Sequence, residues 1–150
     1  MNLASLELDV NYTSDKINKL EKIAIGDWID LRAAKDVVLK AGESALIPLG
    51  VRIRLPEGYE AHVAPRSSTF KTWGIIQTNS IGVIDCTYTG EWMLPVYATR
   101  DTEIHINDRI CQFRLMENQP RLVFLETSDE EFNSYSSARG AGGFGSTGHN

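Results

Sequence analysis

The sequence predicts an all-β fold, a jelly-roll-like barrel or sandwich with very little helix. Three observations predict it: short runs rich in Val, Ile and Leu, their regular spacing, and the turn residues that separate them. The 150 residues suit one domain of ordinary size, and a hydrophobic fraction of 42% is enough to build a core. We therefore expect one β domain over residues 1–127 and a flexible C-terminal arm over residues 128–150.

The expected strands follow from these runs. The run Ser44 to Leu55 is bounded by Ala41-Gly42 and by Pro56-Glu57-Gly58, which are typical turn residues, and it is interpreted as strands separated by turns. An apolar hairpin is expected between Thr78 and Glu91. The remaining runs are Tyr59 to Val63, Glu91 to Ala98, Ile110 to Met116 and Leu122 to Glu126.

Two segments have helical spacing. In Ser14 to Ala24 the apolar residues recur every three to four positions, and Ser67 to Trp73 is closed by Gly74. Only the second segment bears on function, and the predicted fold has this one short helix. Beyond Glu126 the composition has too few apolar residues for a core, which predicts a mobile, Gly-rich arm.

Composition excludes several classes of protein. The net charge of −5 disfavours a nucleic-acid-binding surface, and nowhere do 18 apolar residues run consecutively, so we expect no membrane span. The N-terminus lacks the pattern of a signal peptide, which favours a soluble cytoplasmic protein. Cys86 and Cys111 form no C-x-x-C motif, and the three histidines are isolated, so neither predicts a disulfide framework or a metal site.

The hairpin carries one carboxylate, Asp85, followed by one aromatic residue, Tyr88. A carboxylate at the rim of a β element can deprotonate a water, and a nearby ring can pack on a small molecule. This is the outline of a hydrolytic pocket. The alternative is an ordinary β-turn, which also favours Asp and Gly.

Two further clusters suit anions. Arg66, Ser67 and Ser68 stand at the start of the short helix, where unpaired N–H groups favour negative charge, although either serine can simply cap the helix. The tail places Arg139, Phe144, Ser146 and Thr147 among glycines, a composition that suits phosphates and a base but also a flexible linker. From Ser128 the arm can extend about 50 Å, at roughly 3.3 Å per residue, and reach another subunit.

Single residues complete the candidate set. Asp30 can hold the water shell of a metal, and Gln112 can donate its amide to a phosphate. The alternative is that the charges nearby, on Arg32, Asp108 and Arg109, form a solvated or paired network.

Together these segments resemble the trimeric dUTP nucleotidohydrolase (dUTPase) family. All five blocks occur in the family's order, and the resemblance covers the chain after about residue 26. The blocks are D-L-R-A-A at Asp30 to Ala34, P-R-S-S at Pro65 to Ser68, N-S-I-G-V-I-D-C-T-Y-T-G at Asn79 to Gly90, D-R-I-C-Q at Asp108 to Gln112, and R-G-A-G-G-F-G-S-T-G at Arg139 to Gly148.

The resemblance implies a homotrimer with shared active sites that converts dUTP into dUMP and pyrophosphate with Mg²⁺. It implies that Asp85 activates the attacking water and that Tyr88 lies beneath the deoxyribose, where it excludes a 2′-hydroxyl. It assigns the uracil to Asn79 with the backbone of Gly82, Val83 and Ile84. It assigns the phosphates to Arg66, Ser67, Ser68 and Gln112, the magnesium-bound waters to Asp30, and the closing lid to Arg139, Phe144, Ser146 and Thr147.

Two alternatives stay open. The dCTP deaminases share the fold and the paired serines, but where they have a catalytic Glu this chain has Leu94-Pro95-Val96, which offers no acid or base. A regulatory trimer that binds nucleotide or an unknown protein partner without turnover needs none of Asp85, Arg139 and Phe144. The sequence departs from the commonest pattern at Ser68 and Cys111, which leaves the placement of the phosphates open.

Overall fold

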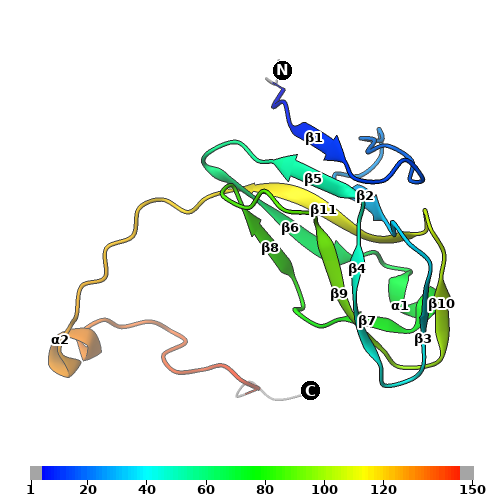
Figure 1. Cartoon of the computed structure of the whole chain (residues 1–150). Coiled ribbons are helices and arrows are strands. Elements are labelled where there is room, and N and C mark those ends of the chain that lie inside the picture. Colours follow the sequence, from blue (N-terminus) through cyan, green and yellow to red (C-terminus); the bar gives the residue numbers. More distant parts are fainter. Residues whose placement is uncertain (1–4, 146–150) are drawn as a thin grey trace. The chain divides into compact units, whose positions relative to one another are not determined.

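The structure is a computed structural model that describes residues 5–145, and it confirms the all-β, jelly-roll-like fold (Figure 1). Contacts divide the chain into two compact units, Met1–Asn118 and Gln119–Asn150. The predicted boundary between residues 127 and 128 stays a prediction. The strands are β1 Asp9–Tyr12, β2 Ile29–Arg32, β3 Val37–Leu39, β4 Ser44–Pro48, β5 Val51–Arg54, β6 Tyr59–Pro65, β7 Ile75–Gln77, β8 Gly82–Asp85, β9 Met93–Ala98, β10 Thr102–Ile104 and β11 Arg109–Glu117; the helices within residues 5–145 are α1 Thr69–Trp73 and α2 Asp129–Asn133.

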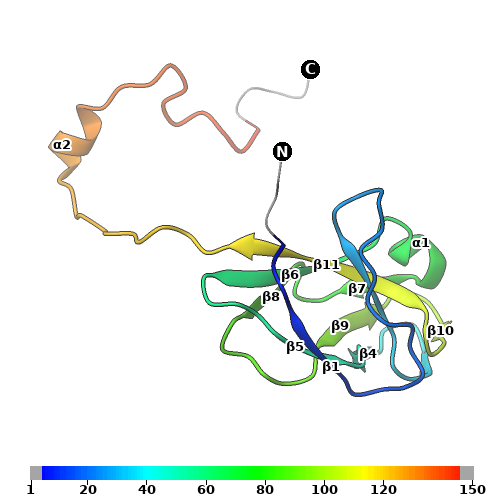
Figure 2. The ribbon, with the colours of Figure 1, turned by 90° about the horizontal axis from the view of Figure 1, so that it is seen from above.

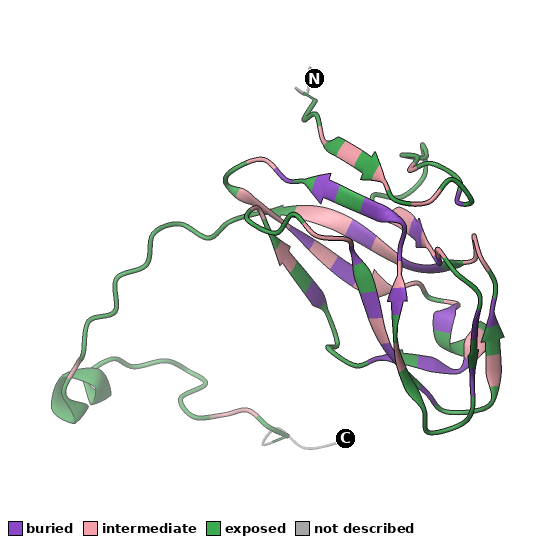
Figure 3. Cartoon of the chain, in the orientation of Figure 1, coloured by how far each residue is buried: buried purple, intermediate pink, exposed green. Residues whose placement is uncertain are grey.

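Antiparallel pairing organises the first unit. The strands β2, β11, β6 and β8 form a four-stranded sheet, β4, β9 and β7 form a three-stranded sheet, and β1–β5 and β10–β3 are pairs. Side chains alternate between core and solvent, as along β5, where Val51 and Ile53 are buried and Arg52 and Arg54 are exposed (Figure 3). In the core, Trp92 and Phe113 meet edge to face with ring centroids 5.1 Å apart.

The run Ser44 to Leu55 divides into β4 and β5 at Gly50, which adopts a φ of +73°. A Cβ at this position would lie 2.7 Å from Cδ1 of Ile17 and 3.2 Å from Cβ of Ala34. Only glycine fits there, because the conformation is left-handed and the neighbours are packed against the backbone. The turn at Gly50, which divides the predicted run, is thus fixed by the close packing of Ile17 and Ala34 against the backbone.

The segment Ser14 to Ala24, whose spacing allows a helix, forms none. Two backbone N–H groups that a helix would use are taken by distant side chains: Asn18 N donates to Oδ1 of Asn107 over 2.7 Å, and Leu20 N donates to Oη of Tyr12 over 2.8 Å. Ile17 is buried in the core, so the segment is anchored as a loop.

The strand expected at Leu122 to Glu126 is also wrong. This segment has no strand conformation, and its Phe124 and Leu125 are exposed. A strand needs a partner for its N–H and C=O groups, and none lies beside it within residues 5–145. The sequence also failed to predict α2, whose first turn is capped when Oγ of Ser128 accepts from Glu131 N over 3.2 Å.

Both views place α1 beside β10 at one end of the β domain, with β8 toward the other end (Figures 1 and 2). The helix α1 begins after Ser68, which lacks a side-chain cap bond. Instead, Oγ1 of Thr69 accepts from Arg66 N over 2.9 Å and donates to the carbonyl of Ile110 over 3.0 Å. These bonds fix Arg66 and Ser67 next to β11. No helix within residues 5–145 has the length and apolar character needed to cross a bilayer.

Candidate active site

Asp85 ends β8 and turns its exposed carboxylate toward Thr87. Oδ1 accepts from Thr87 N over 2.8 Å and also from the Thr87 hydroxyl. These bonds, led by the one from the hydroxyl, hold the pKa of Asp85 below its usual value, because they favour the charged form. Asp85 is therefore ionised at neutral pH and able to accept a proton.

The ring of Tyr88 is held by the same turn. Its hydroxyl donates to the carbonyl of Glu91 over 2.7 Å, and its N–H donates to the carbonyl of Asp85 over 3.2 Å. A Cβ at Gly90 would lie 2.6 Å from Oη of Tyr88 and 2.8 Å from Cζ, so the ring rests directly on the glycine backbone. The turn therefore offers one ring face to a ligand.

A cavity of about 240 Å³ opens beside this turn. It is smaller than the roughly 300–1,000 Å³ pockets that enclose drug-sized ligands, so it suits one part of a larger molecule. The structure thus brings together four predicted site residues: Val83, Ile84, Asp85 and Tyr88. The complete lining of the cavity is Val83, Ile84, Asp85, Tyr88, Glu91, Trp92 and Met93.

Asn79 lies before β8, where the chain approaches Gly82 closely. A Cβ at Gly82 would lie 3.5 Å from Nδ2 of Asn79 and 3.3 Å from Cβ of Val63. Oδ1 of Asn79 accepts from Nε2 of Gln77 over 2.9 Å. The exposed Asn79 amide is therefore fixed at the start of the strand that ends in Asp85.

A second cluster gathers the predicted phosphate residues from β2, β11 and the start of α1. Asp30 forms ion pairs with Nε of Arg66 over 3.0 Å and with Nη1 of Arg109 over 3.3 Å. Nε2 of Gln112 donates to the carbonyl of Pro65 over 3.1 Å. The cluster borders a cavity of about 340 Å³ whose lining is Glu21, Ile23, Ile25, Gly26, Asp27, Trp28, Asp30, Arg66, Ser67, Arg109 and Gln112. Ser68 is not part of this lining.

Both clusters lie on the outer face of the four-stranded sheet but far apart. Asp85 faces Glu60 across β8 and β6, whereas Gln112 faces both Ala64 and Asp30. Residues 60 and 64 on β6 are four positions apart, so the clusters are separated by about 13 Å along the strand direction at roughly 3.3 Å per residue, and β8 and β11 lie on opposite sides of β6. A base acts directly or through one water, within about 6 Å of the proton it takes. One β domain therefore presents two separate clusters of predicted site residues, which we call the Asp85 half and the Asp30 half.

Electrostatics differ between the halves. Beside Asp85 the sheet carries a second carboxylate, Glu60, whose Oε2 lies 2.5 Å from Nε2 of His62. The other half carries two guanidinium groups, on Arg66 and Arg109, with the carboxylate of Asp30 paired to both, and its cavity is also lined by Glu21 and Asp27. The two guanidinium groups suit phosphate oxygens.

The arm residues belong to the second unit. Nε of Arg139 donates to the carbonyl of Gly142, and the side chain of Phe144 is fully exposed. Ser146 and Thr147 lie outside the described residues. The closing of a lid by these four residues stays a prediction.

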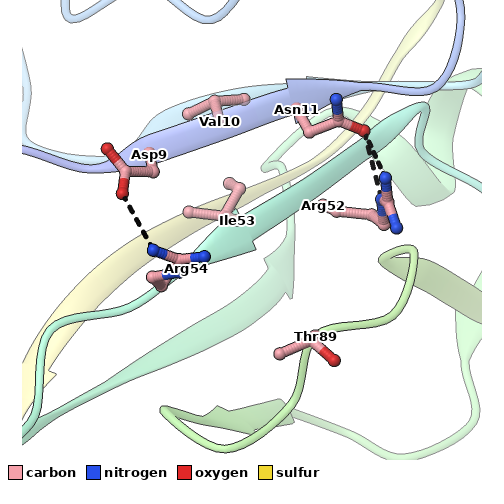
Figure 4. A pocket seen from close by; sticks show the side chains of 7 residues that line it. All are labelled: Asp9, Val10, Asn11, Arg52, Ile53, Arg54 and Thr89. Carbon is pink, nitrogen blue, oxygen red and sulfur yellow. Dashed lines mark hydrogen bonds and ion pairs between the residues drawn. The ribbon is translucent and has the colours of Figure 1, made fainter.

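Another cavity, of about 330 Å³, lies between β1, β5 and Thr89 (Figure 4). None of the predicted site residues lines it. Its two arginines are paired within the β1–β5 ribbon: Arg52 with Oδ1 of Asn11 and Arg54 with Asp9.

Three residues of the two halves were not singled out from the sequence: Thr87 and Gly90 shape the turn, and Gln77 fixes Asn79. The ion pair of Arg109 with Asp30 agrees with the paired charge network that the sequence left as an alternative. A Thr two positions after an Asp is an available turn signal. Gln77 gives no comparable signal, because a polar residue at the end of a strand is usually exposed.

Comparison with known proteins shows which family the chain is similar to. A sequence model of the dUTPase family matches residues 27–148. The chain is 52% identical over 124 residues to the SPbeta prophage-derived deoxyuridine 5′-triphosphate nucleotidohydrolase YosS of Bacillus subtilis (strain 168), covering 81% of this chain and 87% of that protein. It is 36% identical over 146 residues to the deoxyuridine 5′-triphosphate nucleotidohydrolase of Finegoldia magna, covering 93% of this chain and 96% of that protein.

Solved structures show the same fold. The dUTPase of Staphylococcus bacteriophage 80alpha, solved with dUPNHPP, aligns with a TM-score of 0.81 at 22% identity over 97% of this chain and 100% of that chain. The dUTPase of phage phi11 of S. aureus, a mutant described with a structural Mg(II) ion, aligns with a TM-score of 0.74 at 18% identity. The alignment covers 83% of this chain and 99% of that chain. Given the family match over most of its length and the close relatives, this chain belongs to the dUTPase family.

Proposed function

We propose that this protein hydrolyses dUTP to dUMP and pyrophosphate with Mg²⁺, which supplies dUMP for thymidylate synthesis and keeps uracil out of DNA. The observation that carries the proposal is the cavity where the ionised Asp85 and the ring of Tyr88 meet on one turn. A carboxylate base next to a sugar-sized platform suits attack by water on the phosphate closest to the sugar.

In the proposed reaction, Asp85 accepts a proton from water as the water oxygen bonds to the α-phosphorus. The bond from that phosphorus to the oxygen shared with the β-phosphate breaks, and pyrophosphate leaves. Thr87 occupies Oδ1 of Asp85, so Oδ2 is available for the water. Because a carboxylate is a weak base, the reaction also depends on stabilisation of the leaving group by Arg66, by Gln112 and by Arg139 of the arm.

The residues fit a magnesium ion that arrives with the nucleotide. Asp30 supplies the oxygen chemistry that Mg²⁺ prefers, and its ion pairs with Arg66 and Arg109 leave lone pairs for water-mediated contact. Within residues 5–145, no three His, Cys, Asp or Glu side chains gather to hold a metal. When bound, the ion would neutralise phosphate charge, and Asp30 would hold its water shell.

Recognition of the nucleoside is assigned to the half that contains Asp85. The ring of Tyr88, fixed on Gly90, lies where it can pack under deoxyribose and leave no space for a 2′-hydroxyl. Asn79 and the backbone of Gly82, Val83 and Ile84 are assigned to the uracil. Ser67, which lines the phosphate cavity, and the adjacent Ser68, which does not, are assigned to the phosphates. Phe144, Ser146 and Thr147 are assigned to a lid over base and phosphates.

We further propose a homotrimer whose sites are shared between subunits. The separation of about 13 Å along the strand direction, from four residues at roughly 3.3 Å each, supports this, because it exceeds the reach of a base through one water. Both halves lie on the same sheet face, so rotation about a threefold axis can set the Asp85 half of one subunit against the Asp30 half of the next. The cytoplasm, or the host cytoplasm for a phage-encoded chain, is the proposed location, and a regulatory protein partner remains a prediction.

The test is product analysis with Mg²⁺ and dUTP, dCTP, dTTP or UTP offered separately. We expect dUMP and pyrophosphate from dUTP alone. Ammonia from dCTP would favour a deaminase instead, although Leu94 and Val96 are buried in the core and Pro95 has no titratable group. Tight binding of dUTP without turnover would favour the regulatory alternative.

A further inference from the structure

Gln77 ends β7 and is 6% exposed, which is unusual for an amide side chain. Its Nε2 donates to the carbonyl of Val63 over 2.9 Å and to Oδ1 of Asn79 over 2.9 Å. Its Oε1 meets no donor among the described residues. The NH₂ group alone therefore fixes the orientation of this side chain.

The direction of these bonds follows from the backbone. A carbonyl oxygen only accepts, so the group of Gln77 that faces Val63 must be NH₂ and not oxygen. The second hydrogen of this NH₂ group needs an acceptor, and the only acceptor on the Asn79 side chain is Oδ1. The amide of Asn79 consequently turns its own NH₂ group the other way.

That outward NH₂ group lies next to the backbone that the nucleobase would approach. A Cβ at Gly82 would lie 3.5 Å from Nδ2 of Asn79, and Nδ2 donates to no partner within residues 5–145. Ile81 N donates to the carbonyl of Asn79 over 2.5 Å, which holds the tight turn before β8. The chain thus presents a fixed donor at the mouth of the hairpin.

We propose that Gln77 is a specificity-determining positioning residue: it holds the Asn79 amide as a donor, so that the site accepts a pyrimidine with a carbonyl at position 4 and rejects one with an amino group. The inference rests on the proposed function, in which Asn79 contacts the base. Uracil and thymine both present O4 as an acceptor, whereas cytosine presents a donor there. Gln77 therefore separates dUTP from dCTP but not from dTTP.

The test replaces Gln77 with methionine, which has similar length and no donor. Steady-state kinetics give kcat/KM for dUTP, dCTP and dTTP, with circular dichroism and size-exclusion chromatography to check folding and assembly. We expect the ratio of kcat/KM for dUTP to kcat/KM for dCTP to fall roughly tenfold, mainly through KM, because the freed Asn79 amide can present its oxygen to the base. The dUTP-to-dTTP ratio stays unchanged. The matched control is Ile75→Val, a buried change on the same face of β7, which should leave both ratios unchanged.

A second variant avoids the core. Asn79→Asp keeps an acceptor for Gln77 but has no NH₂ group, so it should shift preference toward dCTP. In an Asn79→Ala background, Gln77→Met should have no further effect on the dUTP-to-dCTP ratio. An unchanged dUTP-to-dCTP ratio in Gln77→Met, or an equal fall in both nucleotide ratios, overturns the inference. Binding of non-hydrolysable dUTP and dCTP analogues measures the same preference without turnover, so failure of the proposed hydrolysis is distinguishable from failure of this inference.

Discussion

Mixing two inactive variants tests whether one site is built from two chains. Asp85→Asn removes the base from one half, and its amide oxygen can still accept both bonds from Thr87. Arg66→Ala removes a phosphate ligand from the other half, and Asp30 keeps its ion pair with Arg109. Each variant should fold and assemble, and each should have very low turnover of dUTP.

The expected recovery follows from the separation of the halves. The register of β6 places them about 13 Å apart along the strand direction, at roughly 3.3 Å per residue, and under the shared-site proposal an active site takes its Asp85 half from one subunit and its Arg66 half from another. In trimers assembled at random from equal amounts, half of the subunits carry an intact Asp85 and half carry an intact Arg66. About one quarter of the sites then combine two intact halves, provided that the interface is symmetric.

The assay unfolds and refolds the two variants together and measures pyrophosphate release from dUTP at saturating substrate. We expect about one quarter of the activity of equally treated wild-type protein, because the intact sites are independent. Variants that are refolded separately and then mixed briefly, before subunits exchange, serve as the control. Activity no greater than the sum of the two separate variants, with mixed trimers demonstrated, would mean that each chain contains its own complete site.

The remaining predictions concern the turn and the arm. Thr87→Val removes the hydroxyl that chiefly lowers the pKa of Asp85, so that pKa rises and the acidic limb of the kcat/KM profile moves to higher pH, while Thr87→Ser keeps the wild-type profile. Gly90→Ala would place a methyl group 2.6 Å from Oη of Tyr88 and displace the ring. Kinetics with dUTP and UTP should show the discrimination against UTP relaxed by roughly tenfold. Tyr88→Phe should retain this discrimination. A chain that stops before Arg139 should give normal size-exclusion and melting profiles but kcat lower by at least about tenfold, and normal kinetics would exclude the lid.

Local chemistry was the part of the site that the sequence could predict. Asp85 and Tyr88 are three residues apart, so one short turn is enough to bring them to the same cavity. The blocks around Arg66 and Gln112 also lie together, since β6 and β11 are paired. These predictions needed only the identity of the side chains and their order.

What the sequence could not predict depends on distant partners. The helical spacing of Ser14 to Ala24 gives no sign that Asn107, far along the chain, takes the Asn18 N–H. The apolar run from Leu122 to Glu126 resembles a strand, but strand formation depends on an available edge. The separation of the two halves depends on which residue of β6 faces Asp85, and that register is set by the packing of the whole sheet.

The position of Thr87 bears on how the base works in an assembled site. Asp85 is exposed in the isolated chain, and a neighbouring subunit together with a bound nucleotide would cover it under the shared-site proposal. Covering a carboxylate raises its pKa, because burial disfavours the charged form. Both Thr87 donors lie two residues from Asp85 on the same turn, so they remain bound whatever packs above. The turn itself therefore favours the ionised form of Asp85 when burial opposes it.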